Sequence, residues 1–139
     1  MTQNESTIDP SEEQTASLGQ IKVNHTVVAS IVKMAAASVE GVLSVGGGFV
    51  ENVTALFKEG DKGVKVSEDE VGDYVIEIRC IMEYGVELAK TAENVQMTVA
   101  KQVLTMTGKG ASSVDIVIDG VRHKEEHRKA LESELGEGS

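Results

Sequence analysis

Tryptophan is absent from this sequence of 139 residues, and aromatic residues together make up only 3% of it. The core must therefore be built mainly from valine, isoleucine, leucine, methionine and alanine, within a hydrophobic fraction of 40%. Aromatic side chains anchor many tight interfaces and stack on nucleic-acid bases, and this chain has few to offer. Its length accommodates one domain with one core.

Cysteine and basic residues are also scarce. Cys80 is the only cysteine, so no intramolecular disulfide can form and nothing indicates an oxidising compartment. Because Cys80 lies in an alternating apolar run, we predict a buried thiol and not a reactive one. The chain has 13 basic and 23 acidic side chains, a net charge of −10, which argues against a nucleic-acid partner.

Long hydrophobic runs are missing as well. No apolar stretch approaches the roughly 20 residues that a membrane helix needs. The first ten residues, MTQNESTIDP, have neither the basic nor the apolar region of a secretory signal. We therefore expect a cytoplasmic protein without direct membrane insertion, which lies at the membrane only through a partner.

The charge pattern divides the chain into three parts. Residues 1–18 are polar and acidic and contain the only proline, which predicts a disordered leader. Residues 19–122 are expected to form the domain. The remainder, 123–139, is charged throughout, and we predict a solvated, partly helical tail.

Within the domain, apolar residues recur at three- and four-residue intervals from about His25 to Val39, and predict an amphipathic helix with Asn24 as its N-cap. Ile21 and Val23 alternate with polar residues just before it, which favours a short strand. A short apolar run at 42–45 and a brief helical turn or two at 49–57 are expected to follow.

Alternation with period two then predicts a β-hairpin from residues 62–67 and 72–83. Residues 88–106 change to a period of about 3.6, which predicts a long amphipathic helix ending at Gly108. Alternation returns at 113–119, so strand, helix and strand follow in the order of a parallel crossover. We predict an α+β fold: a single small domain with two main helices packed on one face of a small mixed β-sheet, formed by a β-hairpin plus a parallel βαβ crossover.

Seven short motifs in this order resemble the alkaline-shock and general-stress (Asp-Gls) family of bacteria. They are Gly19-Gln20-Ile21, Val39-Glu40-Gly41-Val42, Gly63-Val64-Lys65-Val66, Tyr84-Gly85, Val95-Gln96, Met106-Thr107-Gly108 and Asp119-Gly120-Val121. The resemblance covers 19–121. It implies a cytosolic protein without known catalytic activity, linked to envelope stress or to envelope and fatty-acid metabolism, and it transfers no catalytic residue.

The motif that fits an enzyme best is His123-Lys124-Glu125-Glu126-His127, which matches the H-x-x-E-H pattern of some zinc proteases. The motif lies in a polar tail with no third ligand in view, so a solvated helix is favoured over adventitious metal binding. The acidic run Glu68-Asp69-Glu70 is read as a solvated loop, with weak cation binding as the alternative. We predict no catalytic residue, cofactor or metal site.

The leading hypothesis is a non-enzymatic, envelope-stress-associated scaffold or adaptor that acts through protein–protein contacts near the cell envelope. Its protein partner could be membrane-anchored, and unpaired strand edges would also allow a homo-oligomer. The alternative is a regulatory binding protein of a metabolic enzyme, such as a carboxylase of fatty-acid synthesis. The candidate interaction surfaces are one sheet face and the outer side of the long helix, marked by Glu77, Arg79, Lys90, Asn94 and Lys101.

Overall fold

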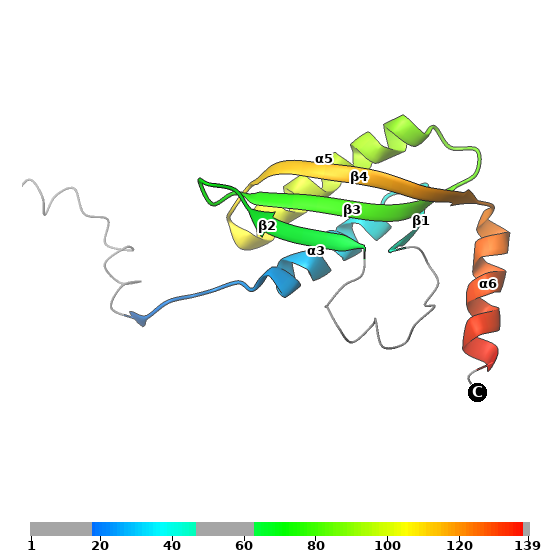
Figure 1. Ribbon diagram of the computed structural model, residues 1–139, viewed down its shortest axis with the longest axis horizontal. Coiled ribbons are helices and arrows are strands. Elements are labelled where there is room, and N and C mark those ends of the chain that lie inside the picture. Colours follow the sequence, from blue (N-terminus) through cyan, green and yellow to red (C-terminus); the bar gives the residue numbers. More distant parts are fainter. Residues whose placement is uncertain (1–17, 47–62, 138–139) are drawn as a thin grey trace, which may run out of the picture.

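The computed structural model describes residues 18–46 and 63–137. Over these residues the elements follow in the order α3 (His25–Ala37), β1 (Val42–Val45), β2 (Val64–Glu68), β3 (Tyr74–Glu83), α5 (Leu88–Thr107), β4 (Ala111–Arg122) and α6 (Lys124–Glu137) (Figure 1). The predicted leader up to residue 17 and the helical turns predicted at 49–57 lie outside the described residues.

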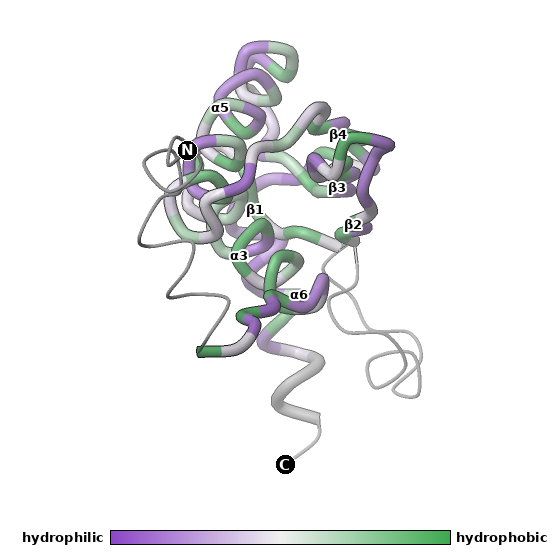
Figure 2. Tube along the Cα trace, turned by 90° about the vertical axis from the view of Figure 1, so that its left-hand side faces the viewer, coloured by the Kyte–Doolittle hydropathy of each residue, from purple (hydrophilic) through white to green (hydrophobic). Residues whose placement is uncertain are grey.

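Two layers make up the domain. The antiparallel helices α3 and α5 lie side by side on one face of the sheet, as the end-on view of Figure 2 shows. Helix α6 continues from the end of β4 and stands apart from this pair (Figure 1). The predicted α+β class, with two main helices on one sheet face, is confirmed.

Strand β3 is the centre of the sheet. Along one edge it pairs in parallel with β4, and along the other it pairs antiparallel with both β2 and β1. Strand β2 pairs with residues 74–78 of β3, and β1 pairs with residues 80–82. The predicted hairpin is therefore present, and β1 and β2 share one edge of β3 end to end.

The junction between β2 and β1 lies beside Arg79 of β3. The Gly46 N–H donates to the Arg79 carbonyl, and the Arg79 N–H donates to the Gly63 carbonyl, each at 2.8 Å. The two glycines lie so close that a Cβ on Gly63 would collide with the backbone of Gly46. Gly63 also has a φ of +85°, so glycine is required there on two counts.

The core lies between β3 and the two helices, and its position follows from the two periodicities. Every second residue of β3 faces the helices, so Tyr74, Ile76, Ile78, Cys80 and Met82 are all buried. Val95, Val99 and Val103 recur at four-residue intervals on α5 and are fully buried, and they face a similar stripe on α3. Gln96 of α5 also donates to the Val114 carbonyl at 2.9 Å, which fixes the helix to β4.

The strand predicted at Ile21 and Val23 is wrong. Residues 19–24 have no regular structure, and Ile21 is 89% exposed. Both edges of β3 are already occupied, and the segment leads into α3 without pairing with any strand among the described residues. Asn24 does stand at the N-cap of α3 with an extended backbone, but its side chain makes no capping hydrogen bond.

Candidate functional site

The sheet face turned away from the helices carries three charged side chains in a row. Arg79 donates from Nε to Asp119 Oδ2 at 3.0 Å and from Nη2 to Asp119 Oδ1 at 2.9 Å. Its Nη1 lies 3.7 Å from Glu77 Oε2 on the same strand. Two of the predicted interface residues, Glu77 and Arg79, thus belong to one charged cluster that spans β3 and β4.

The other predicted interface residues lie on α5. Lys90 and Lys101 are exposed and Asn94 is half-buried, on the side of the helix turned away from its buried stripe. Met97 and Leu104 share this outer side and are 63% and 53% exposed. The five predicted residues therefore form two separate surfaces on opposite sides of the two-layer domain.

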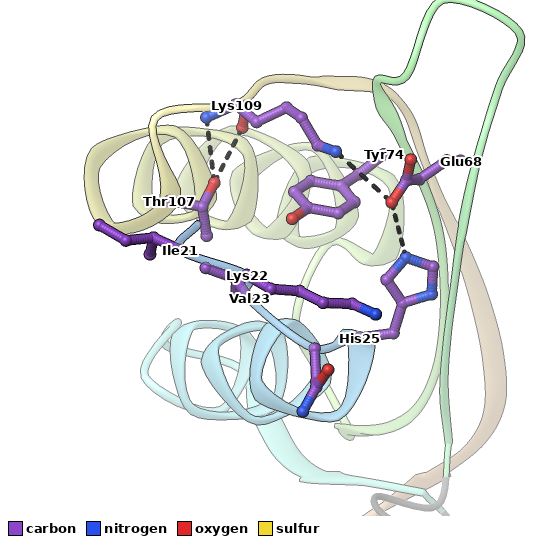
Figure 3. A pocket seen from close by; sticks show the side chains of 9 residues that line it. Ile21, Lys22, Val23, His25, Glu68, Tyr74, Thr107 and Lys109 are labelled. Atoms are coloured by element: carbon purple, nitrogen blue, oxygen red, sulfur yellow. Dashed lines mark hydrogen bonds and ion pairs between the residues drawn. The ribbon is translucent and has the colours of Figure 1, made fainter. Parts of the chain in front are cut away.

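A pocket that the sequence did not reveal lies where α3 begins and α5 ends. Its volume is about 690 Å³, and it is lined by the lead-in to α3, the end of β2, the start of β3 and the residues that follow α5. The lining residues are Ile21, Lys22, Val23, Asn24, His25, Glu68, Tyr74, Thr107 and Lys109 (Figure 3).

Glu68 is the one carboxylate in this pocket, and it is already engaged. Its Oε2 lies 2.8 Å from His25 Nε2 and 3.4 Å from the Lys109 ammonium. The hydrogen bond to His25, reinforced by Lys109, holds the pKa of Glu68 below its usual range. Glu68 is the last residue of β2, so its expected place in a solvated loop is wrong.

Tyr74 forms the wall behind these charges. Lys109 Nζ lies 4.5 Å from the centre of the Tyr74 ring, and the ring of His25 meets it edge-on at 6.0 Å. Cation–π contacts of this kind hold the ammonium over the ring face. One buried tyrosine therefore contacts both partners of Glu68, the His25 ring and the Lys109 ammonium.

The next acidic residue, Asp69, organises the turn between β2 and β3. Its Oδ1 accepts hydrogen bonds from the Val71 and Asp73 amides at 3.1 and 2.9 Å. Burial alone would raise the pKa of Asp69, but the hydrogen bonds from Ser112 and these amides lower it on balance. Asp69 is thus a turn-forming residue, and its oxygens are not free for a cation.

Most described side chains of the helical tail are exposed, but the sequence did not indicate how its two histidines are placed. His127 is buried at 5% exposure, and His123 stacks against Tyr84 with 4.7 Å between ring centres. The side chains of the two histidines thus lie in different environments. Across residues 18–46 and 63–137 no group of three or more His, Cys, Asp or Glu side chains is arranged to hold a metal ion.

Burial also controls the chemistry of the single cysteine. Cys80 is fully buried, as predicted. Desolvation, with a smaller contribution from the Asp119 carboxylate, raises the pKa of the thiol to about 11. The thiolate needed for a nucleophile or a metal ligand is therefore suppressed near neutral pH.

Two of the short motifs on which the family resemblance rests meet at the pocket. Ile21 ends the first motif and Thr107 lies in the motif that closes α5, and both line the cavity. A family profile described as alkaline shock protein 23, with a cell envelope-related function, matches residues 13–123. The chain belongs to this alkaline shock protein family. Its function is accordingly related to the cell envelope.

Three relatives of this alkaline shock family member were found in bacteria. It is 29% identical to the uncharacterized protein YqhY of Bacillus subtilis over 106 residues. This aligned region covers 76% of this chain and 78% of YqhY. It is 28% identical to the uncharacterized protein Spy1535 of Streptococcus pyogenes, over 75% of this chain and 80% of the relative. It is also 28% identical to the uncharacterized protein YloU of Bacillus subtilis, over 75% and 89% of the two chains. No solved structure matches.

Proposed function

We propose that this alkaline shock family member is a non-enzymatic scaffold or adaptor, which acts near the cell envelope through contacts with proteins. The observation that carries the proposal is the open sheet face, where Glu77, Arg79 and Asp119 form a fixed row of alternating charge. Side chains held in place on a rigid sheet lose little freedom when a partner binds. Such a surface suits selective recognition of a protein with complementary charge.

Two further features are compatible with a protein partner. Among the described residues β4 pairs only with β3, so its outer edge is open to another strand, including one from a second copy. None of the described helices is both long enough and apolar enough to cross a bilayer. In this proposal the protein works in the cytoplasm and reaches the membrane through its partner.

The test is site-specific photo-crosslinking in cells with the full chain. A photoreactive residue replaces Lys65, which pairs with Glu77 and is exposed on the open sheet face, and a matched one replaces Lys101 on the outer side of α5. We expect the Lys65 position to capture one discrete protein from the envelope fraction, and the additional change Arg79→Glu to abolish the capture. If neither position captures any protein above the unirradiated sample, the proposal fails; crosslinks only between copies would support a homo-oligomeric scaffold.

The alternative of a regulatory protein for a metabolic enzyme, such as a carboxylase of fatty-acid synthesis, stays a prediction. The same crosslinking experiment separates it from the scaffold, because the captured protein would then be a soluble enzyme. It also predicts that deletion of the gene alters fatty-acid synthesis. Unchanged flux in the deletion strain would remove this alternative.

A further inference from the structure

The pocket between the start of α3 and the end of α5 has the size of a small-molecule site. Its volume of about 690 Å³ lies within the range of roughly 300–1,000 Å³ that is usual for such sites. It lies beside the start of α3 and the end of α5 (Figure 3), whereas Glu77 and Arg79 lie on the sheet face turned away from the helices. A ligand there would therefore be recognised independently of a protein bound to Glu77 and Arg79.

Tyr74 supplies the observation that points to a ligand. The residue is 97% buried, because only 3% of its surface is exposed, and Figure 3 shows its hydroxyl directed into the pocket. Among the described residues this hydroxyl has no hydrogen-bond partner. The buried side-chain atoms that lack a partner in the described residues are Ser44 Oγ and the two ring nitrogens of His127, so the Tyr74 hydroxyl oxygen is not itself sealed off and opens into the cavity. The fixed ring thus presents a donor that nothing in the described part of the chain uses.

The other polar groups of the pocket divide into engaged and unengaged ones. Glu68 is engaged by the His25 ring and the Lys109 ammonium, and the Thr107 hydroxyl donates to the Val103 carbonyl at 2.8 Å. The groups left over are the Tyr74 hydroxyl, the Lys22 ammonium, the Asn24 side-chain amide and the backbone amides that come before Val27 at the start of α3. All four can donate hydrogen bonds, and the ammonium and the helix N-terminus carry full or partial positive charge.

The apolar part of the pocket comes from the lead-in to α3. Ile21 and Val23 flank Lys22 in the chain, line the cavity and are 89% and 37% exposed. An apolar ligand body placed against them would remove this surface from water. Unengaged donors and uncovered aliphatic side chains in one cavity fit an anionic ligand with an apolar part.

We propose that this pocket binds a small organic anion, either a carboxylate or a phosphate monoester. Its oxygens lie between the Tyr74 hydroxyl, the Lys22 ammonium and the N-terminus of α3, and its apolar body lies against Ile21 and Val23. In a chain with a net charge of −10, this pocket is a local site of the opposite sign. The site goes beyond the proposed scaffold function and does not depend on it.

The experiment titrates the ¹⁵N-labelled full chain with four probes and follows the amide resonances. The probes are phenyl phosphate, benzoate, inorganic phosphate as the charge without the body, and benzyl alcohol as the body without the charge. We expect phenyl phosphate or benzoate to cause saturable shifts at residues 21–26 and 107–109. Whichever of these two compounds binds more tightly identifies the ligand class. Inorganic phosphate and benzyl alcohol, which each lack one half of the ligand, are expected to bind at least about tenfold more weakly.

Three variants make the assignment specific. Tyr74→Phe removes only the hydroxyl and is expected to weaken binding about threefold to tenfold, and Lys22→Met about tenfold or more. Lys101→Met, which removes an exposed charge on the outer side of α5, serves as the matched control and should leave binding unchanged. The amide spectrum of each variant shows directly whether it is folded.

Several results would overturn the site. Benzyl alcohol binding as tightly as the anions would remove the requirement for charge. Equal weakening by Lys22→Met and Lys101→Met would reduce the interaction to non-specific attraction. The absence of saturable shifts with phenyl phosphate and with benzoate would end the proposal, while leaving the crosslinking result for the sheet face untouched.

Discussion

Arg79 and Asp119 form a two-point ion pair across the parallel strands β3 and β4, with donor–acceptor distances of 3.0 and 2.9 Å. The pair stands where the register of the two strands shifts, between Cys80 and Ile81 of β3. Here Cys80 lies opposite Ile118 and Ile81 opposite Gly120, so Asp119 is the extra residue of β4. The ion pair therefore fixes the side chain of a bulge residue on the open sheet face, where the alternation of β4 already places it.

This pair is expected to contribute modestly to stability. Both side chains are partly exposed, at 49% and 32%, and exposed ion pairs are worth about 0.2–1 kcal/mol. Urea unfolding of Arg79→Ala, Asp119→Ala and the double variant should give a coupling free energy of about 0.5–1 kcal/mol that shrinks at high salt. A coupling of zero at low salt would show that the observed geometry contributes nothing.

Cys80 should be inert in the folded protein. Its buried thiol has a pKa raised to about 11, so the thiolate is rare at pH 8. We expect a thiol reagent such as Ellman's reagent to react with the unfolded chain in urea at least a hundredfold faster than with the native chain at the same pH. Rapid stoichiometric labelling without denaturant would contradict the burial of this residue.

His127 should make stability depend on pH. Burial, aided by the Arg122 charge, lowers the folded-state pKa of His127 below its ordinary value of 6.5. As pH falls, the unfolded chain therefore binds the proton first. The contribution of His127 to the free energy of unfolding is complete above pH 6.5 and is lost as the pH falls through the folded-state pKa.

Thermal unfolding of the native chain and of His127→Leu between pH 8 and pH 5 measures this effect. The native chain should lose more stability on acidification than the variant, because leucine has no proton to bind. His123→Gln, which changes the stacked histidine instead, is the control and should follow the native curve. Parallel curves for the native chain and His127→Leu would refute the predicted role.

The contact between Gly46 and Gly63 can be tested against another glycine of similar backbone conformation. Gly72 has a φ of +95° but open space where a Cβ would lie, whereas Gly63 has both a positive φ and a blocked position. Gly72→Ala should therefore lower the free energy of unfolding by about 1–2 kcal/mol through strain alone. Gly63→Ala should cost about 1–3 kcal/mol more, through the added collision. Equal losses in chemical denaturation would argue against the end-to-end junction.

The elements that the sequence predicted best are those whose periodicity coincides with burial. Strand β3 buries every second residue and α5 buries a four-residue repeat, so both could be located from the amino acids alone. The alternation at Ile21 and Val23 has the same form, but this segment pairs with no described strand, and strand pairing is a property of the finished sheet. The burial of His127 likewise depends on tertiary packing, which the polar sequence of α6 does not indicate.

The pocket could not have been predicted from the sequence either, because it too depends on tertiary packing. Its principal side chains, Lys22, His25, Glu68, Tyr74 and Lys109, are far apart in the sequence and follow no common spacing. They meet because the antiparallel packing of α3 and α5 brings the start of one helix beside the end of the other. The exposed positions of the residues predicted for the interface on β3 and α5 could be derived because each follows from the period of a single element; their role in an interface stays a prediction.

The shared edge of β3 also provides a point at which a reporter sequence can be inserted. The chain leaves this edge at Gly46 and returns at Gly63, directly beside its point of departure. Because both glycines bond to the backbone of Arg79, these two points of the chain are held together by the sheet itself. A fluorescent protein or an epitope joined at this point would report on the protein in cells, with both chain ends, the helix pair and the pocket left as they are.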